Sequence, residues 1–166
     1  MSDLADPSAR TRPPRFNHVA MSVPADLLGA TGRAEILAFW SGVFGFEELP
    51  SETKDREVLV LSAYDWEQFV FLIAEDEPMT CPRLDHFGMS VGSLAELEGF
   101  LAKAKAFAET DDRVDIIDHK ADVHGDALTL HSFYVRYLLP MMIEIQFFDW
   151  DPAVAALNPA NPGSAR

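Results

Sequence analysis

Two histidines and one glutamate are the residues of this chain whose types and spacing could do chemistry. His18 is the third residue of FNHVAMSV (16–23), and His86 is the third residue of LDHFGMSV (84–91), 68 residues later. Glu144 is a carboxylate in the middle of the otherwise largely apolar segment MMIEIQFFD (141–149). Burying an unpaired carboxylate costs on the order of several kcal/mol, so Glu144 needs a basic partner, hydrogen-bond donors or a cation.

Two neutral imidazoles and one carboxylate are the ligand set of non-haem Fe(II) oxygenases. This set leaves coordination positions open for a substrate and O₂. Mn(II) could use the same ligands, and a zinc site with an open position is also compatible with them. His18, His86 and Glu144 therefore predict a metal site, provided that the fold brings them to one surface.

Strands must position these residues, and both octets are rich in residues that favour strands. Side chains alternate between the two faces of a strand. In each octet the large apolar residues take one face and the histidine takes the other; the apolar positions are Val19, Met21 and Val23 in the first octet, and Phe87, Met89 and Val91 in the second. In the last segment, Glu144 lies opposite Ile143 and Ile145 in the same way. We expect the apolar faces to pack under helices, and the three candidate ligands to lie on the other face.

The order of predicted elements is strand, helix and strands, and it occurs twice. The first half predicts a helix over 33–46, ending at Gly45, and strands over 56–64 and 67–75, with another strand near 46–50. The second half predicts a helix over 94–107, opened by a capping box of Ser93 and Glu96, and strands over 114–123, 128–138 and 141–149. We expect one compact domain made of two modules, 15–77 and 84–150, between a disordered N-terminal tail (1–14) and a mobile C-terminal tail (151–166). No glycine-rich phosphate loop follows the first strand, which excludes a Rossmann fold.

The composition narrows the classes of partner. The chain of 166 residues has 13 Lys and Arg against 27 Asp and Glu, a formal net charge of −14. Such a charge disfavours nucleic acids and anionic membranes as partners. A single cysteine, the lack of a membrane-length apolar run and an N-terminus unlike a signal peptide predict a cytoplasmic protein.

The repeated H-[VF]-[AG]-M-S-V openings and the closing FYVRYLLPMMIEIQ (133–146) resemble the vicinal oxygen chelate superfamily over roughly residues 16–149. That superfamily includes glyoxalase I, methylmalonyl-CoA epimerase, bleomycin-resistance proteins and type I extradiol dioxygenases. The resemblance implies an α+β fold of two βαβββ modules, which form a curved mixed sheet around a metal-centred cavity. It also implies a homodimer.

Within the superfamily, the ligand pattern most resembles the extradiol dioxygenases. Isomerase-like members take a fourth ligand from the last strand of the first module, where this chain has an apolar residue at about Phe71. The resemblance implies that Fe(II) bound by His18, His86 and Glu144 cleaves a small, catechol-like aromatic substrate with O₂. It also assigns His124 to orienting the substrate or stabilising an oxygen intermediate, and Tyr134 to a hydrogen bond with a substrate oxygen.

The chain departs from the extradiol pattern in two places. The usual DPDG turn is replaced by YLLP (137–140), and the interval from His124 to Tyr134 is one residue longer. His119 and His131 are alternatives for the acid–base role. Two other functions stay open: an isomerase, lyase or hydrolase that uses the same metal, and a non-enzymatic protein that binds a small molecule.

Overall fold

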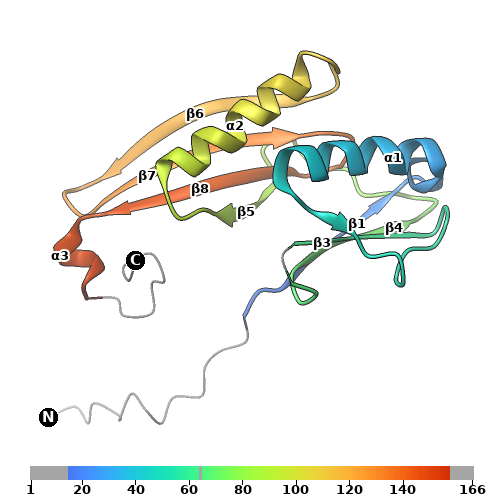
Figure 1. Cartoon of the computed structure of the whole chain (residues 1–166), viewed down its shortest axis with the longest axis horizontal. Coiled ribbons are helices and arrows are strands. Elements are labelled where there is room, and N and C mark those ends of the chain that lie inside the picture. Colours follow the sequence, from blue (N-terminus) through green and yellow to red (C-terminus); the bar gives the residue numbers. More distant parts are fainter. Residues whose placement is uncertain (1–14, 64, 158–166) are drawn as a thin grey trace, which may run out of the picture.

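The computed structural model describes residues 15–63 and 65–157, and this part of the chain forms two four-stranded mixed sheets (Figure 1). The first module contains β1 (His18–Val23), a 3-10 turn η2 (Ala25–Leu28), α1 (Ala30–Phe39), a π-helical turn η3 (Trp40–Phe44), β2 (Glu47–Glu48), β3 (Val58–Ser62) and β4 (Phe69–Ala74). The second contains β5 (His86–Ser90), α2 (Leu94–Ala108), β6 (Asp115–His124), β7 (Leu128–Arg136) and β8 (Met142–Trp150). The strand orders, β1-β4-β3-β2 and β5-β8-β7-β6, are the same. The predicted pair of βαβββ modules is confirmed.

Local signals in the sequence account for the helix boundaries. The first helix passes into η3 and ends at Gly45, whose φ of 75° is the left-handed conformation that glycine adopts without a Cβ clash. At the start of α2, the Ser93 side chain accepts a hydrogen bond from the Glu96 backbone N–H at 3.2 Å. The Glu96 carboxylate accepts one from the backbone N–H of Gly92 at 2.8 Å. The capping pattern predicted from Ser93 and Glu96 therefore begins the helix.

The C-terminal end of α1, with η3, lies beside α2 (Figure 1). Phe39 of α1 packs edge-on against Phe107 of α2, with ring centroids 5.3 Å apart, and Phe44 contacts Phe100 at 5.9 Å. The apolar strand residues under the helices, such as Met21 and Ile145, belong to the same buried cluster. The two modules thus share one core. Each sheet also keeps a second face, opposite the helices, which we call its open face.

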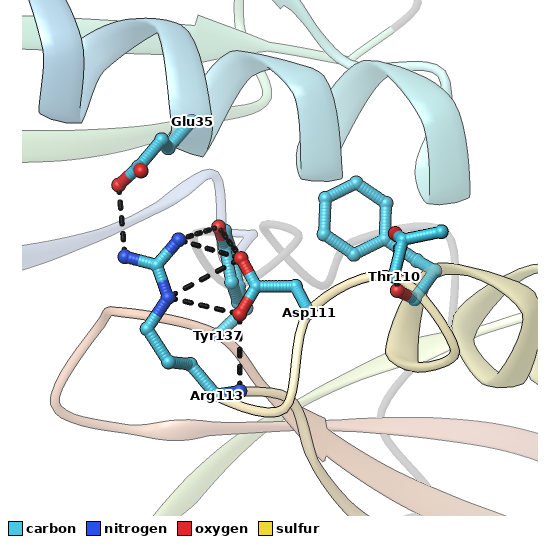
Figure 2. Close-up of polar contacts among 6 residues, drawn as sticks. Glu35, Thr110, Asp111, Arg113 and Tyr137 are labelled. Atoms are coloured by element: carbon cyan, nitrogen blue, oxygen red, sulfur yellow. Dashed lines mark hydrogen bonds and ion pairs between the residues drawn. The ribbon is translucent and has the colours of Figure 1, made fainter.

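A polar network crosses the boundary between the modules beside this core (Figure 2). Arg113, in the α2–β6 loop, donates hydrogen bonds to Glu35 of α1 at 3.0 Å and to the Tyr137 hydroxyl at 2.9 Å. Asp111 pairs with Arg113 and accepts a hydrogen bond from the Tyr137 hydroxyl at 2.7 Å. Arg113 and Tyr137 together hold the pKa of Asp111 well below its usual range. The network ties α1 to the second module.

The segments predicted as tails are described only in part. Residues 152–155 form a short helix, α3 (Pro152–Ala155), and the Asp151 side chain caps it by accepting a hydrogen bond from the Ala153 N–H at 2.8 Å. Asp151 and Pro152 are favourable residues for the start of this helix, which lies at the beginning of the segment predicted as a C-terminal tail. Residues 1–14 and 158–166 lie outside the described residues. None of the described helices has the length and apolar character needed to cross a membrane.

Candidate metal centre

The open face of the second sheet brings two of the three predicted ligands together. His86 is the first residue of β5, and Glu144 lies on β8, diagonally across from it. The distance between His86 Nε2 and Glu144 Oε2 is 3.3 Å. This proximity follows from the strand register, which pairs His86 with Met142 and Gly88 with Glu144. Glycine at position 88 leaves space beside Gln146 and the carboxylate, since an added Cβ would lie 3.3 Å from Gln146 Oε1 and 3.8 Å from Glu144 Oε2.

The orientation of the His86 ring is set by its other nitrogen. His86 Nδ1 lies 2.7 Å from the backbone carbonyl oxygen of Leu84, which can only accept a hydrogen bond. Nδ1 therefore carries a proton, and in the neutral imidazole Nε2 presents a lone pair to Glu144. A lone pair facing a carboxylate at this distance is unfavourable unless a proton or a metal cation lies between them. Donation of the second ring N–H to a backbone carbonyl is also the usual arrangement of a metal-binding histidine.

Glu144 is buried, with only 6% of its surface exposed. The Gln146 side-chain amide donates a hydrogen bond to Glu144 Oε2 at 2.9 Å. Among the described residues, His86 is the one basic side chain within ion-pair distance of Glu144. A single amide donor does not neutralise the charge, so the need for a cationic partner, inferred from the sequence, persists in the fold.

Tyr134 completes this cluster from β7, where it pairs directly with Glu144. Its ring meets the His86 ring edge-on, with centroids 5.1 Å apart and an interplanar angle of 85°. Contact with the Glu144 carboxylate, followed by burial, raises the pKa of Tyr134 above its usual value. The phenol therefore stays protonated at neutral pH and can donate a hydrogen bond on the open face.

His18 lies on the open face of the other sheet, apart from this cluster. Its ring stacks on Phe69, with centroids 4.8 Å apart and an interplanar angle of 1°. Its Nδ1 lies 2.9 Å from Asn17 Oδ1, which leaves Nε2 available as a ligand atom. His18 lines a cavity of about 500 Å³ between β1 and β5, and neither His86 nor Glu144 lines it. Within 15–63 and 65–157, no three His, Cys, Asp or Glu side chains are close enough to hold a metal ion.

The strand registers also locate the counterpart of Glu144 in the first module. His18 pairs with Phe69 and Ala20 with Phe71, as His86 pairs with Met142 and Gly88 with Glu144. Phe71 therefore stands in the place of Glu144, as the sequence predicts. The first sheet offers one histidine and no carboxylate at this place.

The three remaining histidines lie away from the cluster. His124 ends β6 and pairs with Leu128, which in turn pairs with Trp150. Trp150 is six residues along β8 from Glu144, roughly 20 Å at the usual rise per strand residue. The structure thus does not bring His124 to the pair, because the extradiol resemblance gives an order along the chain and not a position along this long hairpin. His119 and His131 contact each other on the face that carries α2.

Two contacts of the cluster were not assigned from the sequence. The role of Gln146 could have been found, because it is two residues from Glu144 in a strand and so shares its face. The hydrogen bond between His86 and the Leu84 carbonyl could not be predicted from the sequence, since any residue provides a backbone oxygen.

Comparisons with known proteins agree on the fold. No protein-family model matches the sequence, and no curated protein sequence is detectably similar to it. Solved structures do match. A lactoylglutathione lyase from Agrobacterium tumefaciens has 16% identity and a TM-score of 0.54, over 81% of this chain and 94% of that one. The fosfomycin resistance protein FosX from Listeria monocytogenes has 15% identity and a TM-score of 0.54, over 85% and 95%.

A third similar structure is a glyoxalase/bleomycin resistance protein/dioxygenase family enzyme from Burkholderia phytofirmans. It has 13% identity and a TM-score of 0.51, over 78% of this chain and 95% of that one. The chain has the glyoxalase fold. At these identities the likeness establishes the architecture alone, because one fold can carry many activities.

Proposed function

We propose that this protein is a divalent-metal-dependent enzyme whose metal is held by His86 and Glu144. The observation that carries the proposal is the 3.3 Å approach of His86 Nε2, with its lone pair forward, to a buried carboxylate that has no other basic partner among the described residues. The donor set fits Fe(II), Mn(II) or Zn(II). A bound divalent cation would lower the pKa of substrate hydroxyls and draw two neighbouring oxygens into chelation.

The third ligand in this proposal is His18 of a second copy of the chain. Within one chain, the cavity that His18 lines is lined by neither His86 nor Glu144. A two-fold dimer can place the open face of one copy's first sheet over the open face of its partner's second sheet. Two equivalent His–His–Glu sites would then form.

The reaction that we propose first is extradiol ring cleavage of a catechol-like aromatic by O₂, with Fe(II) as the metal. The presence of Phe71 where a fourth ligand would stand supports it, because three protein ligands leave positions for a bidentate substrate and O₂. Tyr134 would donate a hydrogen bond to a substrate oxygen. Glu144, held by Gln146, would be the carboxylate ligand. The proposal assigns no role to His124, which lies at the far end of β6.

A second candidate is an isomerase or lyase acting on an oxygen-chelating substrate bound to the same metal. One observation favours it: within the described residues, none of the other histidines lies beside the His86–Glu144 pair to act as the acid or base that the extradiol resemblance implies. The lactoylglutathione lyase with the same fold is a protein of this class. Lactoylglutathione is therefore the second substrate to test.

The test begins with anaerobic loading of the purified protein with Fe(II) and measurement of bound iron. Catechols and O₂ are then added, and the yellow ring-fission product is followed by absorbance. His86→Ala should abolish metal binding and turnover, whereas the matched control His124→Gln should leave both unchanged. Metal binding without cleavage of any catechol would redirect the assignment to the second candidate. An absence of metal binding would leave a non-enzymatic binding protein and would end the proposal.

A further inference from the structure

A second cluster of histidines lies on the opposite face of the second sheet, at a β-bulge in β6. The β6–β7 register runs from Ile117 opposite Tyr134 to Lys120 opposite Ser132, so one extra residue is inserted in β6. In a regular ladder, His119 would pair with Ser132 and lie on the open face. The bulge turns it to the face that carries α2. Bulges re-aim side chains in this way, and they occur often beside functional sites.

His119 meets His131 of β7 on this face. His119 Nε2 lies 3.0 Å from His131 Nδ1, and the two rings are stacked at 5.2 Å with an interplanar angle of 21°. His131 is held from its other side by Phe147, whose ring centroid is 6.0 Å away. His119 is exposed and His131 is half-buried, so a dissolved ion can reach both.

The distance between the two ring nitrogens matches a chelate. Two nitrogens that each bind a metal at about 2.0–2.1 Å, and lie 3.0 Å apart, subtend an angle of roughly 90° at the metal. This is the angle between neighbouring ligands in the tetragonal sites that Cu(II) and Ni(II) prefer, and it is smaller than the tetrahedral angle at zinc. For both nitrogens to bind, the imidazole that donates the present hydrogen bond must carry its proton on its outer ring nitrogen instead.

Asp118 anchors the bulge in β6 to α2. Asp118, the other bulge residue, accepts two hydrogen bonds from Lys105 Nζ of α2, at 2.7 and 2.9 Å, and one from the His119 backbone N–H at 2.8 Å. These contacts fix the bulge and therefore the position of His119. The formal net charge of −14 also raises the concentration of cations near the surface.

We propose that His119 and His131 form a transition-metal site of their own, separate from the His86–Glu144 pair and suited to Cu(II) or Ni(II). The site binds the ion through His119 Nε2 and His131 Nδ1, with water in the remaining positions. It does not depend on the function proposed above, because the two clusters lie on opposite faces of the sheet.

The test uses the full-length chain carrying His86→Ala, which removes the first cluster as a competing site, with Cu(II) as the probe. We expect one Cu(II) per chain, with an electron paramagnetic resonance spectrum that shows two equatorial nitrogens. Mutating a residue that holds a metal ligand in place typically lowers metal affinity roughly 10–100-fold. Removing a ligand itself should cost at least as much, so a second substitution, His119→Asn or His131→Asn, should weaken Cu(II) binding at least ten-fold. Adding His124→Asn instead, on the same hairpin, should leave the affinity unchanged.

Two results would overturn the proposal. One is the absence of stoichiometric copper binding by the His86→Ala chain. The other is copper binding that survives both His119→Asn and His131→Asn, because the ion would then lie elsewhere. As a second readout on the unmodified chain, substoichiometric Cu(II) should broaden the imidazole resonances of His119 and His131 before those of His124. Simultaneous broadening of all three would also count against the site.

Discussion

The open faces of the two sheets have the same backbone and different chemistry. On the first sheet, His18 lies against Phe69, and Phe71 and Val60 fill the places next to it. On the second sheet, the corresponding places beside His86 hold Met142, Glu144 and Tyr134. The two modules thus have a histidine at the same place, and the second has a carboxylate and a phenol beside it. In the proposed site, the second sheet would provide the charged ligand, and the first would provide one further ligand and an apolar wall.

Replacing the histidines one at a time should have the largest effect. We expect His86→Ala to lose metal and to lower kcat/KM by at least about 100-fold, close to 3 kcal/mol of transition-state stabilisation. His18→Ala should lower kcat/KM by a similar factor if both sheets contribute ligands, while the fold measured by circular dichroism stays intact. Full activity of the His18→Ala protein would show that the second sheet works alone.

Mixing the two variants tests whether the ligands come from different copies. A dimer of one His18→Ala chain and one His86→Ala chain contains one intact site and one doubly defective site. Random two-fold pairing should therefore restore about a quarter of the sites, measured as metal bound and as turnover after co-refolding. No recovery in a mixture that dimerises would place all the ligands within one chain.

Tyr134→Phe should have an intermediate effect, because it changes the phenol and keeps the ring that packs on His86. We expect metal binding to be retained and kcat to fall about ten-fold, the loss of one hydrogen bond worth about 1.4 kcal/mol in the transition state. Since contact with Glu144 raises the pKa of Tyr134, the wild-type phenol stays protonated past its ordinary range. If the wild-type enzyme loses activity near pH 10, the Tyr134→Phe protein should lose it too. If the variant kept its activity there, Tyr134 would be deprotonated near pH 10, which would contradict its raised pKa.

Tyr137→Phe should have the smallest effect, and it tests how firmly the two modules are joined (Figure 2). Loss of the buried hydroxyl should lower the free energy of unfolding by about 1 kcal/mol, measured by urea denaturation at pH 7. Burial and Asp111 raise the pKa of Tyr137 from 10.0 to about 12. A raised pKa in the folded state contributes stability below pH 10 that is lost as the pH rises toward 12. The variant should lose less stability than wild type over that interval, and equal losses would contradict the network.

The elements of the fold could be predicted because their signals are local. Alternation identified the strands and placed Met21 under the helices, and Ser93 and Gly45 marked where a helix begins and another ends. The contact of His86 with Glu144 also followed, since the two residues lie on adjacent strands of one sheet. The separation of His18 could not be predicted, because alternation says which face a residue takes and not how two sheets are oriented to each other.

The remaining histidines show the same limit. The position of His119 depends on a single inserted residue in β6, which reverses the expected face and has no clear sequence signal. His124 was placed by resemblance to a family pattern, and the length of the β6–β7 hairpin carries it away from Glu144.

The central claim is that Glu144 and His86 share a metal ion, and a binding titration tests it most directly. Mn(II), which is paramagnetic, can be titrated into the wild-type protein and into the Glu144→Gln variant, with free ion measured by electron paramagnetic resonance. Glutamine keeps the shape of the side chain and removes its charge. We expect about one ion bound per chain in the wild type and a loss of affinity of at least about 100-fold in the variant. Equal affinity of the two proteins for Mn(II) would contradict the account.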